Sequence, residues 1–141
     1  MIDLSVPVAA GFALLSALHL YWAAGGRIGA EAALPERDGA PLFQPGLVST
    51  LAVAGLLALA ALLVLAHGGH LPANALPPWM VRVGVPAVAV VLLARAIGEF
   101  RYVGFFKRVR ATRFARLDTR VYSPVALLLG AATAIVACST P

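Results

Sequence analysis

The chain has 141 residues, of which 61% are hydrophobic and 12% are charged. A soluble domain carries about 25% charged residues, so this composition excludes a soluble globular protein. The mean hydropathy of +0.90 favours a single transmembrane domain over residues 1–141. The net charge of +5 does not indicate nucleic acid, because seven of the eleven basic residues lie in 101–120, beside an apolar run. The expected partners there are the membrane and its anionic lipid headgroups.

Four long apolar runs predict an all-α fold, an integral membrane four-helix bundle. The expected spans are about 5–24, 46–66, 78–98 and 123–137. The first run has no basic residue before it, so we interpret it as a retained span and not a cleaved signal peptide. Ser5 and Ser123 are expected to cap the first and fourth helices, and Pro86 is expected to kink the third.

The connections between the runs differ in charge. Residues 25–45 are polar and carry both signs of charge, whereas 67–78 hold two histidines and no other ionisable side chain. The third connection alternates aromatic and basic residues, and its spacing over 100–117 predicts an amphipathic helix in the plane of the membrane surface. The basic side chains of this helix, Lys107, Arg108 and Arg110, are expected to meet lipid phosphates.

The distribution of basic residues predicts the orientation of the chain. Arg27, Arg37 and the 95–120 segment lie on one side of the spans, and Arg82 is the only basic residue near the other side. Because the side rich in arginine and lysine stays in the cytoplasm, both termini are expected outside.

Two pairs of prolines share one spacing. Pro7 and Pro86 are 79 residues apart, and so are Pro45 and Pro124. This spacing suggests two tandem helical hairpins related by an axis along the membrane normal. The alternative stays open that prolines simply favour the first turn of a helix.

Three ionisable residues are expected near one depth of the membrane. His19 lies in the first span, and Arg95 and Glu99 lie four apart in the third, where they are placed to pair directly. In a functional interpretation, His19 and Glu99 are a catalytic acid and base and Arg95 holds an anionic group. In the structural alternative, which we favour, Arg95 and Glu99 form an ion pair at the headgroups and His19 bonds a backbone carbonyl.

The candidate ligand-binding residues cluster at the cytoplasmic end. They are Arg95, Trp22, Arg101, Lys107, Arg108, Arg110 and Arg113. No cofactor and no metal site are expected, because His67, His70, Asp3 and Cys138 come from separate regions of the chain. Asp118, between Arg116 and Arg120, is expected to neutralise the basic segment.

Three stretches carry a resemblance to a known family. They are LHLYWAAGGRIG, LPERDGAPLFQPG and RAIGEFRYVGFFKRVRATRFARLDTRVYSP. Together they resemble a family of small bacterial four-span membrane proteins catalogued only as a domain of unknown function. The resemblance implies a bacterial inner-membrane protein and assigns no site residue.

The sequence leaves three functions open. The favoured one is a non-enzymatic inner-membrane protein whose cytoplasmic-leaflet groove and basic loop bind anionic lipid, a lipophilic ligand or a partner protein. The others are a membrane enzyme that uses His19 and Glu99 on a lipophilic substrate, and a small proton-coupled transporter. Four short helices hardly enclose a broad aqueous path in one chain, which favours a homo-oligomer or a larger membrane complex.

Overall fold

The computed structural model describes residues 2–139, and its main elements are helices. The long helices are α1 (Ser5–Ala23), α2 (Leu47–His67), α3 (Pro78–Ile97) and α5 (Ser123–Cys138). The short elements are the 3-10 helix η1 (Glu31–Ala33), the strands β1 (Glu36–Arg37) and β2 (Ala40–Pro41), the helix α4 (Arg113–Leu117) and the π-helix η2 (Asp118–Tyr122). The two strands pair antiparallel and form a small hairpin within the first connection.

The helices confirm the prediction of four membrane spans. Four of them are long and apolar enough to cross a bilayer, and the last is one helical run from Arg113 to Cys138 that comprises α4, η2 and α5. Large apolar side chains lie exposed along them, such as Leu56 on α2 and Val90 on α3. Exposed side chains of this kind are stable against lipid and not against water, so the chain is a multi-pass membrane protein.

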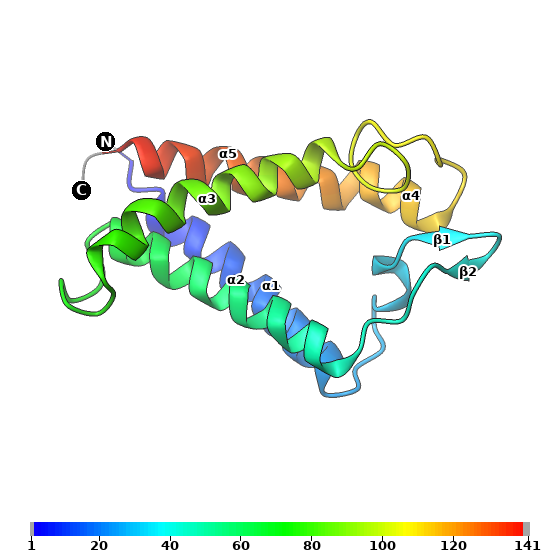
Figure 1. Ribbon diagram of the computed structural model, residues 1–141, viewed down its shortest axis with the longest axis horizontal. Coiled ribbons are helices and arrows are strands. Elements are labelled where there is room, and N and C mark those ends of the chain that lie inside the picture. The colour runs from blue at the N-terminus through cyan, green and yellow to red at the C-terminus, as the bar shows by residue number, and fades with distance from the viewer. Residues whose placement is uncertain (1, 140–141) are drawn as a thin grey trace.

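The four helices form two hairpins that meet at one end and diverge at the other. α1 packs along α2, and α3 packs along α5. Figure 1 shows the two hairpins as the arms of a V, with the 24–46 connection across its open side. The core lies where the arms converge, and one buried side chain from each helix marks it: Phe12, Val64, Val85 and Val136.

Glycines allow the two hairpins to approach. A Cβ added at Gly84 of α3 would come within 2.8 Å of Leu63 of α2, and one added at Gly11 of α1 within 2.9 Å of Leu129 of α5. Each contact therefore seats a leucine of one hairpin against the bare backbone of the other, which is how closely packed membrane helices associate.

The converging end also holds Asp3, Ser139 and the turn between α2 and α3. Nε2 of His70 lies 2.6 Å from Oδ2 of Asp3, and Nε2 of His67 lies 3.1 Å from the carbonyl oxygen of Ser139. The expected cap at Ser5 is wrong, because Ser5 is the first helical residue and its N–H donates to Oδ1 of Asp3 at 2.8 Å.

The proline spacing does not mark equivalent positions, although the two hairpins themselves are present. Pro7 lies in the first turn of α1, whereas Pro86 lies inside α3, which continues through it. Pro45 precedes α2, but Pro124 lies inside a continuous helical run. The beginnings of the helices thus do not follow a 79-residue repeat. The tolerance of proline near helix starts does not account for the shared spacing either, because Pro86 lies inside α3.

The basic connection is not the in-plane helix expected over 100–117. Residues 98–112 form turns and bends, and the helix begins only at Arg113, after Thr112. The Thr112 hydroxyl accepts a hydrogen bond from the Ala115 N–H at 3.0 Å and caps this helix. Ser123 is therefore not a cap, since its backbone already continues the helical run.

Candidate functional site

A fully buried aspartate organises the end of the second hairpin. Asp118 is 0% exposed, and its Oδ1 accepts a hydrogen bond from Nη2 of Arg95 at 2.7 Å. Its Oδ2 accepts from Nζ of Lys107 at 2.9 Å and from the N–H of Gly104 at 2.8 Å. We call these four residues, together with Thr119, whose Oγ1 lies 2.6 Å from Nζ of Lys107, the Asp118 cluster.

The backbone of the 98–112 loop is folded tightly around this cluster. Gly98 and Gly104 both have positive φ, of 91° and 89°. Their backbones lie so close together that a Cβ added at either glycine would collide with backbone atoms at or next to the other. The carboxylate of Glu99 accepts from the N–H groups of Tyr102 and Val103 and holds the turn. The loop therefore has a defined, compact backbone conformation that is held by hydrogen bonds.

A π-helix places the aspartate. η2 begins at Asp118 and interrupts the α-helical pattern between α4 and α5. Such insertions occur often at functional sites, because they rotate the following side chains relative to a regular helix. Within residues 2–139, two buried polar atoms near this segment have no hydrogen-bond partner: Nη1 of Arg95 and Oγ of Ser123.

The cluster corrects two expectations about the basic residues. Arg95 pairs with Asp118 and not with Glu99, whose carboxylate caps the loop. Lys107 is only 2% exposed and is bound to Asp118, so its ammonium group is not presented to lipid phosphates. The expectation that Asp118 neutralises the basic segment agrees with its two ion pairs, but its burial was not foreseen.

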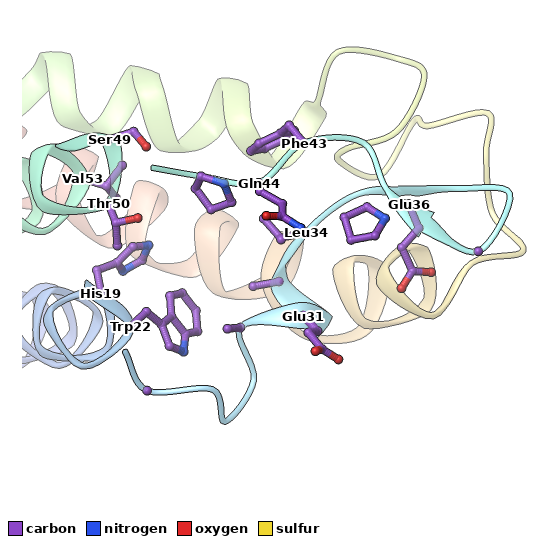
Figure 2. A pocket seen from close by; sticks show the side chains of 16 residues that line it. His19, Trp22, Glu31, Leu34, Glu36, Phe43, Gln44, Ser49, Thr50 and Val53 are labelled. Carbon is purple, nitrogen blue, oxygen red and sulfur yellow. The ribbon is translucent and has the colours of Figure 1, made fainter. Parts of the chain in front are cut away.

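A cavity of about 870 Å³ lies at the open end of the first hairpin. Figure 2 shows it between the last turn of α1, the first turns of α2 and the 26–45 connection. Its polar or aromatic lining side chains are His19, Trp22, Glu31, Glu36, Phe43, Gln44, Ser49 and Thr50. We call it the His19 cavity.

Two side chains from α1 are fixed in this cavity. Nδ1 of His19 lies 2.8 Å from the carbonyl oxygen of Leu15, which agrees with the backbone bond expected for this histidine. Because a carbonyl only accepts, Nδ1 carries the proton, and Nε2 has no partner within the described residues. The indole of Trp22 donates to the carbonyl of Ile28 at 2.9 Å and packs edge-on against the imidazole.

A second hollow, of about 620 Å³, lies beside the β1–β2 hairpin and shares Glu36 and Gly39 with the His19 cavity. Three arginines line it, Arg37 from β1, Arg101 from the loop and Arg113 from the start of α4. The guanidinium of Arg101 lies 5.1 Å from the centre of the Tyr102 ring, a cation–π distance. We call this hollow the arginine groove.

The structure thus divides the sequence-based candidates among three places. His19 and Trp22 line the His19 cavity, Arg101 and Arg113 line the arginine groove, and Arg95 and Lys107 belong to the Asp118 cluster. Arg108 and Arg110 are exposed on the loop. Glu99 and Arg95 are not among the residues that line the His19 cavity, so the three ionisable groups proposed for catalysis do not share one cavity.

Sequence reasoning missed Glu31, Glu36 and Arg37. They lie in the 25–45 connection, which has no periodic pattern, and the 3-10 helix η1 and the short β1–β2 hairpin bring them into the linings of the His19 cavity and the arginine groove. The one sequence feature that could have indicated a site there was the presence of both positive and negative side chains in this connection.

Comparison with known proteins gives a family and no assigned activity. No curated protein and no solved structure matches the chain. A family model described as "Protein of unknown function (DUF3995)" matches residues 12–133, which include all four membrane helices in whole or in part. This chain therefore belongs to that family of proteins of unknown function.

Proposed function

We propose that this protein is a non-enzymatic membrane protein that binds anionic lipid headgroups in the arginine groove. The observation that carries the proposal is the convergence of Arg37, Arg101 and Arg113 on one hollow, at the end of the molecule that holds ten of the eleven basic residues. Guanidinium groups bind phosphate oxygens in a bidentate manner.

The structure of the loop supports this role. The Asp118 cluster holds the 98–112 segment against η2, and Arg101, Arg108 and Arg110 are exposed at the end of the bundle. Each exposed basic residue near an anionic membrane surface contributes about 1 kcal/mol of attraction. Glu36 and Asp38 also line the groove, so a headgroup there meets a mixed but predominantly basic wall.

The retention of lipids by the purified protein tests this proposal. The protein is reconstituted in bilayers of equal parts phosphatidylcholine and phosphatidylglycerol, extracted in mild detergent, and its bound lipids are counted by native mass spectrometry. Phosphatidylglycerol is expected to be enriched. Because two arginines are removed, the Arg101→Gln/Arg113→Gln variant is expected to lower that enrichment by roughly tenfold or more.

The control variant is Arg82→Gln, which removes the basic residue at the opposite end of α3. It is expected to retain the wild-type lipids. Equal enrichment in the double variant and the wild type, or an equal loss in the control, would remove the arginine groove as the binding site.

We further propose that the basic end faces the cytoplasm of a bacterial cell, with both termini outside the inner membrane. The distribution of arginines supports this orientation. The single cysteine, Cys138, is exposed at the other end and gives a direct test. A membrane-impermeant maleimide is expected to label Cys138 in intact spheroplasts.

A matched variant carries Cys138→Ser together with Arg108→Cys. It is expected to react only after the membrane is permeabilised, because residue 108 lies in the basic loop. The reverse pattern of labelling would invert the orientation and place the arginine groove against the outer leaflet.

A further inference from the structure

We propose that the His19 cavity binds a lipophilic cation, an organic ammonium or phosphonium ion with apolar substituents. This site adjoins the arginine groove, with which it shares Glu36 and Gly39 of the β1–β2 hairpin, but it contains none of the groove's arginines, and its ligand has the opposite charge.

The charges that line the cavity support a cationic ligand. Glu31, which is exposed, and Glu36, which is half-buried and also borders the arginine groove, contribute two carboxylates to its edge, and no lysine or arginine is among the lining residues that the structure describes. This is a local reversal of charge, because ten of the eleven basic residues of the chain lie at the same end of the molecule. A bound anion would meet two carboxylates and no counter-charge, whereas a bound cation would be neutralised.

The aromatic and apolar lining favours a cation that carries apolar groups. Leu34, Phe43 and Val53 line the cavity together with Trp22, whose indole is held by its bond to the Ile28 carbonyl. Tryptophan is the best aromatic partner for a cation. The volume of about 870 Å³ is within the range of small-molecule sites, about 300–1,000 Å³.

The position of the cavity gives such a ligand a route. Its walls are the last turn of α1 and the first turns of α2, which places it at the boundary between the acyl chains and the headgroups. Amphiphilic cations concentrate at this depth near an anionic membrane surface. The imidazole of His19 lines the site as well, and its Nδ1 is held by the Leu15 carbonyl.

The fluorescence of Trp22 reports on binding. The chain has two tryptophans, and the Trp79→Phe variant leaves only the one in the cavity. This variant is placed in phosphatidylcholine nanodiscs and titrated with tetraphenylphosphonium and with tetraphenylborate, two ions of nearly the same size and shape but opposite charge. The phosphonium is expected to change Trp22 emission with saturation, and the borate is expected to show only unsaturable partitioning.

Variants of the carboxylates complete the test. Glu31→Gln/Glu36→Gln is expected to weaken phosphonium binding by about tenfold or more, because two counter-charges are lost. Asp38→Asn removes a carboxylate from the same hairpin outside the cavity and is expected to bind as the wild type does. Unchanged melting temperatures verify that all variants are folded.

The outcomes are separable from the proposed lipid role. Arg101→Gln/Arg113→Gln is expected to bind phosphonium normally while it loses phosphatidylglycerol. Equal saturable binding of both ions, an absence of saturable binding, or unchanged affinity in the double glutamine variant would each overturn the cation site.

Discussion

Nζ of Lys107 lies 2.9 Å from Oδ2 of Asp118, and the two side chains are 1% and 0% exposed. The two residues are 11 positions apart in the sequence, and no local sequence pattern predicts that both would be buried. The pair is stable there because its hydrogen bonds are nearly complete: Asp118 accepts three, and the ammonium donates also to Gly104 O at 2.8 Å and to Thr119. The cluster therefore joins α3, the 98–112 loop and the beginning of the last helix.

Removal of the buried carboxylate charge is expected to destabilise the protein strongly. The Asp118→Asn variant leaves Lys107 and Arg95 with an amide in place of their counter-ion, and breaking a buried pair in this way costs about 3–5 kcal/mol. The measurement is reversible unfolding in mixed micelles of sodium dodecyl sulfate.

The matched control is Asp38→Asn. Oδ2 of Asp38 lies 3.6 Å from Nε of Arg37, and the side chains of Asp38 and Arg37 are 92% and 64% exposed. Exposed ion pairs of this kind contribute about 0–1 kcal/mol to stability. A loss in Asp118→Asn no larger than in this control would show that the Asp118 cluster does not hold the loop.

Substitution of Gly98 or Gly104 by alanine is expected to disrupt the 98–112 loop through its backbone. At Gly98 and Gly104 a Cβ would both collide with backbone atoms and require positive φ. Gly39, in the β1–β2 turn, also has positive φ, of 80°, but a Cβ there has no described atom within 4 Å. Gly39→Ala is thus expected to lose about 1 kcal/mol, and Gly98→Ala or Gly104→Ala several times as much, measured by the same unfolding assay. Similar losses at all three positions would refute the close backbone crossing.

The number and placement of the membrane helices could be predicted from the sequence because long apolar runs are a collective signal that no single residue alters. The first three spans agree with α1, α2 and α3 to within two residues. The periodicity of aromatic and basic residues after Phe100 was misleading, because Gly98 and Gly104 and the buried carboxylate impose a compact loop there. Tertiary contacts prevailed over a local pattern.

The candidate sites were less predictable for a related reason. His19 and Trp22 were identified from their depth in a span, and they do line a cavity. Their partners from the 25–45 connection are placed by the six-residue β1–β2 hairpin and by one turn of 3-10 helix, neither of which has a sequence periodicity. Arg95 and Glu99 satisfied the spacing of a helical ion pair, but the helix ends at Ile97, and Glu99 therefore turns to the loop.

Substitution by alanine is expected to change the stability of the protein differently at two buried serines, Ser16 and Ser123. Oγ of Ser16 donates to the Ala54 carbonyl oxygen at 2.8 Å and joins α1 to α2, so Ser16→Ala is expected to lose about 1 kcal/mol of stability. Oγ of Ser123 is buried without a partner among the described residues. Ser123→Ala removes an unsatisfied group and is expected to be neutral or stabilising by a similar amount. Destabilisation of Ser123→Ala beyond that of Ser16→Ala would indicate that a bound water or ligand satisfies the hydroxyl.

The pair of Asp3 and His70 at the opposite end is expected to give a pH dependence. The Ser5 N–H, and then the His70 side chain, hold the pKa of Asp3 below its ordinary value of 3.8. Since the pKa is lower in the folded state, the stabilisation from this carboxylate is fully present above pH 3.8 and is lost as the pH falls through the folded-state pKa. Carbon-13 NMR of the labelled carboxyl group measures this pKa. In His70→Gln it is expected to rise towards 3.8 but to stay below it, because Ser5 still donates. An unchanged pKa in this variant would show that the imidazole does not contribute, and a pKa of 3.8 in the wild type would show that the Ser5 N–H does not stabilise the Asp3 carboxylate.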